Sequence, residues 1–367
     1  MTRKAGRPPQ TIAHSAYLQS PPRIATILGS FLVLALPLVV LQLVQPPGWF
    51  ALAAAYVTFL GGTHFLITLG VYLHGENLRY FASSASRTVV YFVTPAAILL
   101  GFFLLGYFGL DVNHEGASAA FLLWLLPFTL VVKGLDYLHV VRQSFGMLQL
   151  FKGQTGVAFP PWMRRSDNGF FLTMAGLQLW TFIGGMRTDR FVFVLDPVSA
   201  VLLAVAVLCV SGVMAGFAAA FRRARKGAVV WVPLTYFLFQ AASASLAAWR
   251  TELYAASLAM HYVEYHVIIF PRLFTFELNP ASRADRAAAW IRRHKLAFYL
   301  ALGVLAIFVA RNNLWPTVSA RLGPRRELWL LFNLFNGIFV THYFVEAFIW
   351  KFRDPYYRKS LAPLYFP

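Results

Sequence analysis

Six histidines lie within or at the ends of apolar segments, and three of them have a carboxylate partner at helical spacing. In the sequence HYFVE, His342 and Glu346 are four residues apart, so on a helix their side chains share a face about one turn apart. In HYVEYH, His261 and Glu264 are three residues apart and also share a face. Each pair can therefore present two polar groups to one point in space.

A third polar stripe is predicted in the sequence DYLHVVRQ, where Asp136, His139 and Gln143 lie along one helix face. Asp136 is expected either to orient the ring of His139 by accepting the hydrogen bond from its far nitrogen or to form an ion pair with Lys133 on the same helix. Gln143 is a polar group in or next to the same site. His64 stands alone in GGTHFLITLG, with Thr68 as its polar neighbour one turn later.

The two histidines of HYVEYH, His261 and His266, are predicted to lie on different faces of their helix. His266 lies five residues after His261, about 140° round a regular helix, and nearly opposite Glu264. We therefore predict that His266 supports the site from behind, unless the helix unwinds before Pro271.

Neutral imidazole and carboxylate are ligands that iron, zinc, manganese and copper share. Helical spacing of three or four residues lets one rigid helix offer two such ligands. The candidate metal ligands are His64, His139, His261, Glu264, His342 and Glu346. They suffice for one six-coordinate ion or two ions of lower coordination, with Glu264 and Glu346 also as the catalytic carboxylates. The alternatives are a proton relay or buried hydrogen-bonded pairs.

The composition of the chain indicates the class of protein in which these residues lie. Of the 367 residues, 59% are hydrophobic and only 13% are charged, and the mean hydropathy is +0.60. A soluble domain usually has about 25% charged residues, so we predict a polytopic membrane protein. A single cysteine excludes a disulfide-stapled scaffold. The net charge of +18 is assigned to basic loops facing anionic lipid headgroups rather than to nucleic acid.

Ten apolar runs predict an all-α bundle of about ten transmembrane helices. They are Ile24–Val44, Phe50–His74, Thr88–Leu110, Ser118–His139, Phe170–Met186, Pro197–Phe221, Val229–Ala248, Leu253–Phe274, Leu296–Ala310 and Leu328–Trp350. With a cytoplasmic N-terminus, most of the 32 lysines and arginines fall on the cytoplasmic side. Both termini are therefore predicted to be cytoplasmic, with the candidate ligands near mid-membrane or in the cytoplasmic half.

The predicted organisation is a disordered basic tail (1–23), one transmembrane domain (24–350) and a basic, aromatic interfacial tail (351–367). The longest predicted loop, Val141–Gly169, is aromatic and apolar, so part of it is expected to lie in the membrane interface as an amphipathic helix. Arg142, Arg272 and Arg353 are predicted to meet lipid phosphate headgroups.

Several common catalytic motifs are absent from the sequence. It contains no phosphate-binding glycine loop, GxSxG, HExxH or CxxC pattern. This argues against the usual nucleotide enzymes, serine hydrolases and thiol redox proteins.

The histidines and carboxylates spread over several spanning helices resemble the design of membrane-embedded fatty-acid desaturases, hydroxylases and alkane monooxygenases. The HxxxH and HxxHH boxes of those families do not occur here, so no ligand is transferred by motif. The resemblance implies a di-iron site that activates dioxygen against a lipid-like chain.

The leading hypothesis is a multi-pass, membrane-bound, iron-dependent oxidoreductase (an oxygenase, hydroxylase or desaturase) acting on a lipid or isoprenoid. Its partners would be membrane lipids, an apolar substrate and an electron-donor protein, in the inner membrane if the source is bacterial. Zinc or haem are the alternative cofactors. The alternative functions are a haem-binding electron-transfer protein and a proton-coupled transporter that uses the same His and Glu residues.

Overall fold

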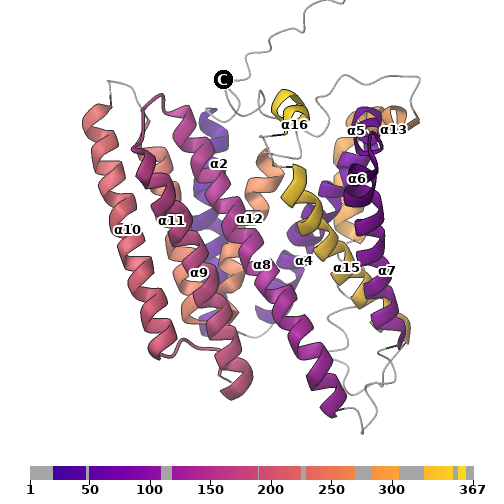
Figure 1. Ribbon diagram of the computed structural model, residues 1–367, viewed down its shortest axis with the longest axis horizontal. Coiled ribbons are helices and arrows are strands. Elements are labelled where there is room, and N and C mark those ends of the chain that lie inside the picture. Colours follow the sequence, from indigo (N-terminus) through magenta and orange to yellow (C-terminus); the bar gives the residue numbers. More distant parts are fainter. Residues whose placement is uncertain are drawn as a thin grey trace, which may run out of the picture.

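The computed structural model describes residues 20–46, 49–108, 118–188, 190–224, 229–268, 283–305, 326–349 and 354–360. Nearly all of them are helical (Figure 1). Within these ranges the only β pairing is an isolated bridge between Val192 and Arg250. The predicted all-α fold is confirmed.

The helices have the following bounds in chain order. They are α2 (Pro21–Ser30), η1 (Phe31–Ala35), α3 (Leu36–Val44), α4 (Trp49–Thr68), η2 (Leu69–Leu73), α5 (Gly75–Phe81), α6 (Ala85–Thr88), η3 (Val89–Val93), α7 (Thr94–Phe108), α8 (Ser118–Gln154), α9 (Pro161–Thr188), α10 (Pro197–Arg223), α11 (Trp231–Trp249), η5 (Thr251–Leu253), α12 (Tyr254–Ile268), α13 (Arg283–Arg293), α15 (Arg326–Ile349) and α16 (Pro355–Ser360).

Four helical runs in the described ranges are long and apolar enough to cross a membrane, judged by length and composition. They are Pro21–Val44, Ala85–Leu104, Pro161–Thr188 and Pro197–Arg223. Two shorter apolar helices cover Phe59–Leu73 and Lys295–Leu305. Helices of membrane-spanning length, the coarser part of the prediction, are therefore present.

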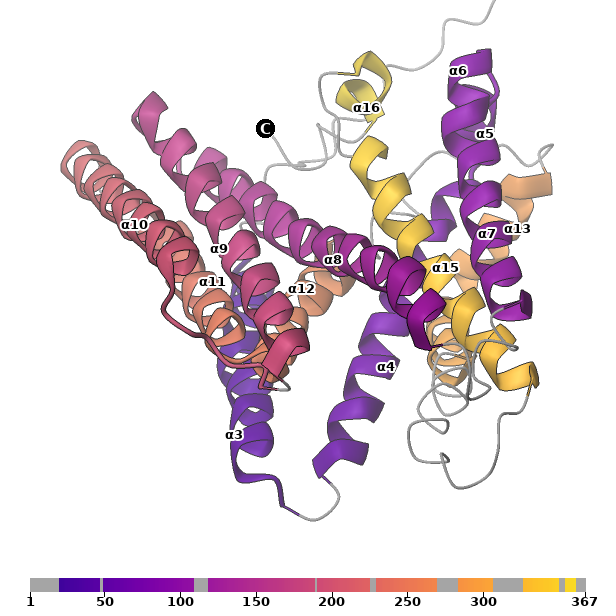
Figure 2. The same ribbon diagram turned by 60° about the horizontal axis from the view of Figure 1, so that its bottom comes forward.

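The helix α12 lies at the centre of the arrangement and packs against α2, α4, α8 and α11. On one side of it, α9 packs between α8, α10 and α11, and on the other side α7 packs on α15. Figures 1 and 2 show the long helix α8 running obliquely from the first group toward the second. A polar residue on α8 or α12 can therefore meet residues of both groups.

The prediction of a loop over Val141–Gly169 is wrong, and so is the prediction of a separate interfacial helix within it. The helix α8 continues to Gln154, and α9 begins at Pro161, so only a short connection remains. The apolar residues that made the segment unlike a free linker are core residues, with Leu148 and Phe151 buried in the main hydrophobic cluster. Their burial stabilises the extra helical turns.

The start of α10 is defined by a capping box. The Asp196 carboxylate accepts a hydrogen bond from the backbone N–H of Ser199, and the Ser199 hydroxyl accepts one from the backbone N–H of Asp196. The Ser199 N–H, together with the indole N–H of Trp180, lowers the pKa of Asp196 below its usual value. Pro197 then occupies the first helical position, where its missing N–H is harmless.

Both predicted tails contain helical residues. The helix α2 begins at Pro21, inside the predicted tail 1–23, whose earlier residues lie outside the described ranges. In the C-terminal tail, α16 packs on the region of α5, where the Tyr356 ring stacks on Tyr80 at 3.8 Å between centroids. The Tyr357 hydroxyl donates to that of Tyr91 at 2.9 Å. Aromatic contacts thus attach α16 to the helical body.

Candidate metal centre

Four helices bring four histidines to one point: His64 from α4, His139 from α8, His261 from α12 and His342 from α15. One ring nitrogen of each lies within 4.8 Å of those of the others. All four were predicted as ligands, and the structure places them together. They form a group that can hold a metal ion, and we call it the four-histidine group.

The four-histidine group is buried. His64 and His342 are 0% exposed and His261 is 1% exposed, whereas the side chain of His139 is 10% exposed. Because α4, α12 and α15 are apolar helices packed against their neighbours, a polar side chain on an inward face is removed from water. His139, on α8, keeps the largest exposed fraction and is the member of the group nearest to the surface.

The ring geometry is compact. The ring centroid of His64 lies 4.4 Å from that of His342 and 4.7 Å from that of His261. The ring centroid of His139 lies 5.0 Å from those of His261 and His342. The Nε2 atoms of His64 and His261 are 3.1 Å apart. Two nitrogens bound tetrahedrally to one ion at 2.0–2.1 Å would be about 3.3–3.4 Å apart, so the observed spacing fits shared ligation.

Each of the four histidines has one buried ring nitrogen without a hydrogen-bond partner among the described residues. These atoms are Nδ1 of His64, Nε2 of His139, Nδ1 of His261 and Nε2 of His342. An unpaired polar group costs free energy in an apolar interior, on the order of 1–3 kcal/mol. For His139 and His342 the unpaired atom is Nε2, whose lone pair is available to an ion. For His64 and His261 the unpaired atom is Nδ1, because their Nε2 atoms face each other, and it is these Nε2 atoms whose spacing fits shared ligation. The donor set as a whole fits a metal that prefers imidazole.

Glu346 borders the four-histidine group. Its Oε2 lies 3.5 Å from Nε2 of His139, and its Oε1 lies 3.8 Å from Nδ1 of His342. Oε1 also accepts a hydrogen bond from the Thr68 hydroxyl at 3.0 Å. The shared face predicted for His342 and Glu346 is thus observed, while ligation by Glu346 stays a prediction.

Glu264 lies outside the four-histidine group and has other partners. Its Oε1 accepts hydrogen bonds from Gln240 at 2.6 Å and from the Tyr236 hydroxyl at 2.8 Å, and its Oε2 accepts one from Gln143 at 3.3 Å. Gln143 also donates to the backbone carbonyl of His261 at 3.2 Å. Glu264 and Gln143 thereby tie α12 to α8 and α11 beside the site, and metal ligation by Glu264 stays a prediction.

Of the two roles expected for Asp136, the structure shows the ion pair with Lys133. In the described part of the chain no hydrogen bond joins it to His139. Instead its Oδ1 accepts from the hydroxyls of Tyr343 at 2.5 Å and Tyr254 at 3.0 Å, and its Oδ2 lies 3.4 Å from Nζ of Lys133. The ring of Tyr343 stacks on His139 at 4.2 Å. Asp136 therefore reaches His139 through Tyr343, because its own oxygens are occupied by two tyrosine hydroxyls and Lys133.

His266 lies outside the four-histidine group. Its Nε2 lies 3.0 Å from the Thr63 hydroxyl, and its Nδ1–H donates to the backbone carbonyl of Tyr262 at 2.6 Å. The helix α12 continues through Ile268, so the two histidines of HYVEYH remain on different faces.

Of the three arginines predicted to meet lipid headgroups, only Arg142 lies in the described ranges. Its side chain is exposed, and its guanidinium donates to the Asn168 side chain at 2.7 Å. Arg272 and Arg353 lie outside the described residues.

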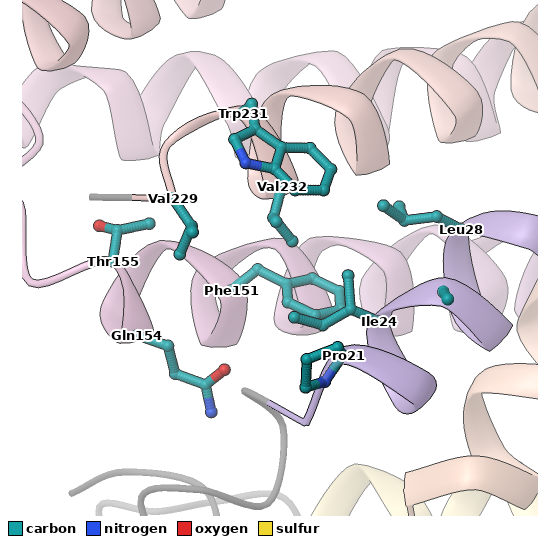
Figure 3. A pocket seen from close by; sticks show the side chains of 10 residues that line it. Pro21, Ile24, Leu28, Phe151, Gln154, Thr155, Val229, Trp231 and Val232 are labelled. Atoms are coloured by element: carbon teal, nitrogen blue, oxygen red, sulfur yellow. The ribbon is translucent and has the colours of Figure 1, made fainter. Parts of the chain in front are cut away.

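A separate cavity of about 480 Å³ lies where α2 and the end of α8 meet the start of α11 (Figure 3). Its lining residues are Pro21, Ile24, Ala25, Leu28, Phe151, Gln154, Thr155, Val229, Trp231 and Val232. None of them is a histidine or a carboxylate, so this cavity is no metal site.

Sequence reasoning missed most of the residues that hold the ligands in place. Tyr343 directly follows His342, and Thr68 lies one turn after His64, so these two were detectable by proximity. Tyr236 and Gln240 reach Glu264 from α11. No local pattern marks them, because their partner is on another helix.

Comparisons with protein-family models, with characterised proteins and with solved structures gave no match to this chain.

Proposed function

We propose that this chain is an integral-membrane, iron-dependent oxidoreductase, an oxygenase, hydroxylase or desaturase, that acts on a lipid or isoprenoid-like substrate. The observation that carries this proposal is the four-histidine group, in which buried ring nitrogens from four different helices lie within 4.8 Å of one another. A redox-active iron held there would supply the activation of dioxygen. The residues of the chain bind the ion, keep water out and orient the imidazoles.

The available ligands favour one ion rather than two. Di-iron sites in helical bundles use several carboxylates in addition to histidines. Here Glu264 is engaged by Gln240, Tyr236 and Gln143, and the carboxylate beside the group is Glu346. Four imidazoles with one nearby carboxylate suit a single iron that keeps a position open for a reactant.

The packing of the rings supports a bare ion over haem. In a bis-histidine haem the porphyrin lies between two axial imidazoles. In the four-histidine group, centroids of neighbouring rings are 4.4–5.0 Å apart, and the other imidazoles occupy the space that a macrocycle would need. Zinc remains the alternative to iron, because it also accepts four imidazoles.

The membrane arrangement belongs to the same proposal. We infer a multi-pass protein with about ten crossings, both termini cytoplasmic, in the inner membrane if the source is bacterial. Charge at the helix ends supports it: Arg79 and Arg358 lie on the short helices α5 and α16, which are at the same end of the bundle (Figure 1). Basic residues are enriched on the cytoplasmic side of membrane proteins.

The surface of α8 supports an apolar substrate that arrives from the bilayer. Val131, Leu135 and Leu138 are exposed at helical spacing on this helix, and Arg142 continues the same face one turn later. His139, the most exposed member of the four-histidine group, is next to Leu138. A lipid chain lying along this face, with its headgroup near Arg142, would bring its interior carbons to the site. Electrons would come from a separate donor protein.

The first test is the metal content of the purified full-length protein in detergent, without chelators. We expect about one iron per chain by mass spectrometry, and loss of most of it in His342→Ala, because removal of one ligand breaks a coordinate bond in a buried site. The control is His294→Ala, which lies outside the group and should retain wild-type metal content.

The outcomes separate the alternatives. Fewer than about 0.2 equivalents of any transition metal in the wild type would overturn the proposal, since a site of four preorganised imidazoles binds metal tightly. Two irons per chain would restore a di-iron site, and an absorption band of haem would move the function to electron transfer. Activity is then tested with ¹⁸O₂ and a lipid extract, where a mass increase or a new double bond in a lipid product is expected.

A further inference from the structure

The Thr68 hydroxyl is the hydrogen-bonding centre behind the four-histidine group. Thr68 is the last residue of α4, and its side chain is 0% exposed. Its Oγ1 lies 2.7 Å from Nδ1 of His342, 2.5 Å from the hydroxyl of Tyr265 and 3.0 Å from Oε1 of Glu346. Three helices are thus joined through one oxygen atom.

Counting protons assigns the direction of the hydrogen bonds to Glu346 and His342. A threonine hydroxyl has one hydrogen to donate and two lone pairs to accept with. A carboxylate oxygen only accepts, so the Thr68 hydrogen goes to Glu346. Nδ1 of His342 must then donate to Thr68, because the Thr68 hydroxyl has no second hydrogen to give. The Thr68 contact with the His64 carbonyl is longer, at 3.4 Å, and adds little.

This assignment determines which nitrogen of His342 is free. With the proton on Nδ1, the neutral ring has its lone pair on Nε2, and Nε2 is the buried nitrogen of His342 without a partner. We propose that Thr68 is a positioning residue for the metal centre. It fixes the tautomer of His342 so that Nε2 is the ligand, and it holds Glu346 beside the site. This inference rests on the proposed metal site.

The test is a Co²⁺ titration of the full-length protein in detergent, followed by the visible spectrum of the bound cobalt. Thr68→Val keeps the shape of the side chain and removes the hydroxyl, so we expect Co²⁺ affinity to fall about 10–100-fold, as for other outer-sphere partners of ligands. The spectrum should change as well. Thr68→Ser retains the hydroxyl and should restore both the affinity and the spectrum.

Thr63→Val is the matched control. Thr63 is also 0% exposed and also on α4, but its hydroxyl hydrogen-bonds His266, which is outside the four-histidine group. It should bind Co²⁺ like the wild type. If Thr68→Val binds Co²⁺ as tightly as Thr63→Val and has the same spectrum, the inference is wrong. If the wild type itself binds no Co²⁺, it is the proposed metal site that fails.

A second measurement does not depend on the folding of the variant. In wild-type protein with ¹⁵N-labelled histidine and bound Zn²⁺, nitrogen NMR should show His342 protonated at Nδ1 and coordinated through Nε2. Correlations from the ring nitrogens to the sequence-assigned backbone identify the His342 signals. Coordination through Nδ1 would overturn the role given to Thr68, whatever the behaviour of Thr68→Val.

Discussion

Replacing His261 with alanine should remove the bound metal completely and abolish activity, whereas replacing His266 should leave most of the metal in place. His261 is 1% exposed, and its Nε2 lies 3.1 Å from that of His64. His266 hydrogen-bonds Thr63 and the carbonyl of Tyr262 instead. The two residues are on one helix, so differences in the stability of α12 are largely matched between the variants.

The measurement is metal per chain after identical purification, with elution volume from a sizing column as the check on folding. For His266→Ala we expect any loss of activity to stay within about 10–100-fold, the range typical of groups that support a ligand. Equal metal loss in the two variants would show that α12 does not keep the histidines on separate faces. Retention of metal in both would mean that the four-histidine group does not hold the ion.

Replacing Lys152 with alanine should destabilise the protein by about 3–5 kcal/mol, because it leaves a buried carboxylate without its counter-ion. Nζ of Lys152 on α8 lies 2.5 Å from Oδ2 of Asp167 on α9, and the two residues are 5% and 0% exposed. After the substitution, Gln149, 2.9 Å from the same oxygen, would be its remaining donor there. Thermal unfolding in detergent measures the effect.

The double variant Lys152→Met, Asp167→Leu tests whether the destabilisation comes from the unpaired buried charge or from the loss of the ion pair itself. Replacing a buried ion pair by apolar residues is often neutral or stabilising, so most of the stability should return. A control on the exposed pair Arg250–Glu252, made by Glu252→Ala, should change stability by about 0–1 kcal/mol. Similar small effects for Lys152→Ala and Glu252→Ala would contradict the importance of this buried pair.

Apolar runs correctly predicted that the described part of the chain is helical and includes helices of membrane-spanning length. Long stretches with few charges predicted helices, and α10 runs over Pro197–Arg223, close to the expected Pro197–Phe221. Spacing of four residues placed Glu346 beside His342, and spacing of five left His266 outside the four-histidine group, where it bonds to Thr63. These are properties of one helix, determined by 3.6 residues per turn, so the sequence alone determines them.

The ends of helices were harder to predict from the sequence, because they depend on which side chains become buried. The segment after His139 contains charged and polar residues, including Lys152 and Gln154, which lowered its resemblance to a membrane helix. In the folded chain α8 nevertheless continues to Gln154, because Lys152 finds Asp167 on α9 and Phe151 packs into the core. A charge that is neutralised by a distant partner cannot be recognised as buried from its own neighbours in the sequence.

The sequence by itself determined that the chain is helical and apolar, that its histidines lie on particular helix faces, and that they can serve as ligands. Only the tertiary structure decided that His64, His139, His261 and His342 meet within 4.8 Å, while Glu264 bonds to Tyr236 and Gln240. Helical periodicity sets the direction of a side chain relative to its own axis. Which faces meet depends on how helices far apart in the chain pack, and each buried polar group then takes the partner that this packing brings within hydrogen-bonding distance.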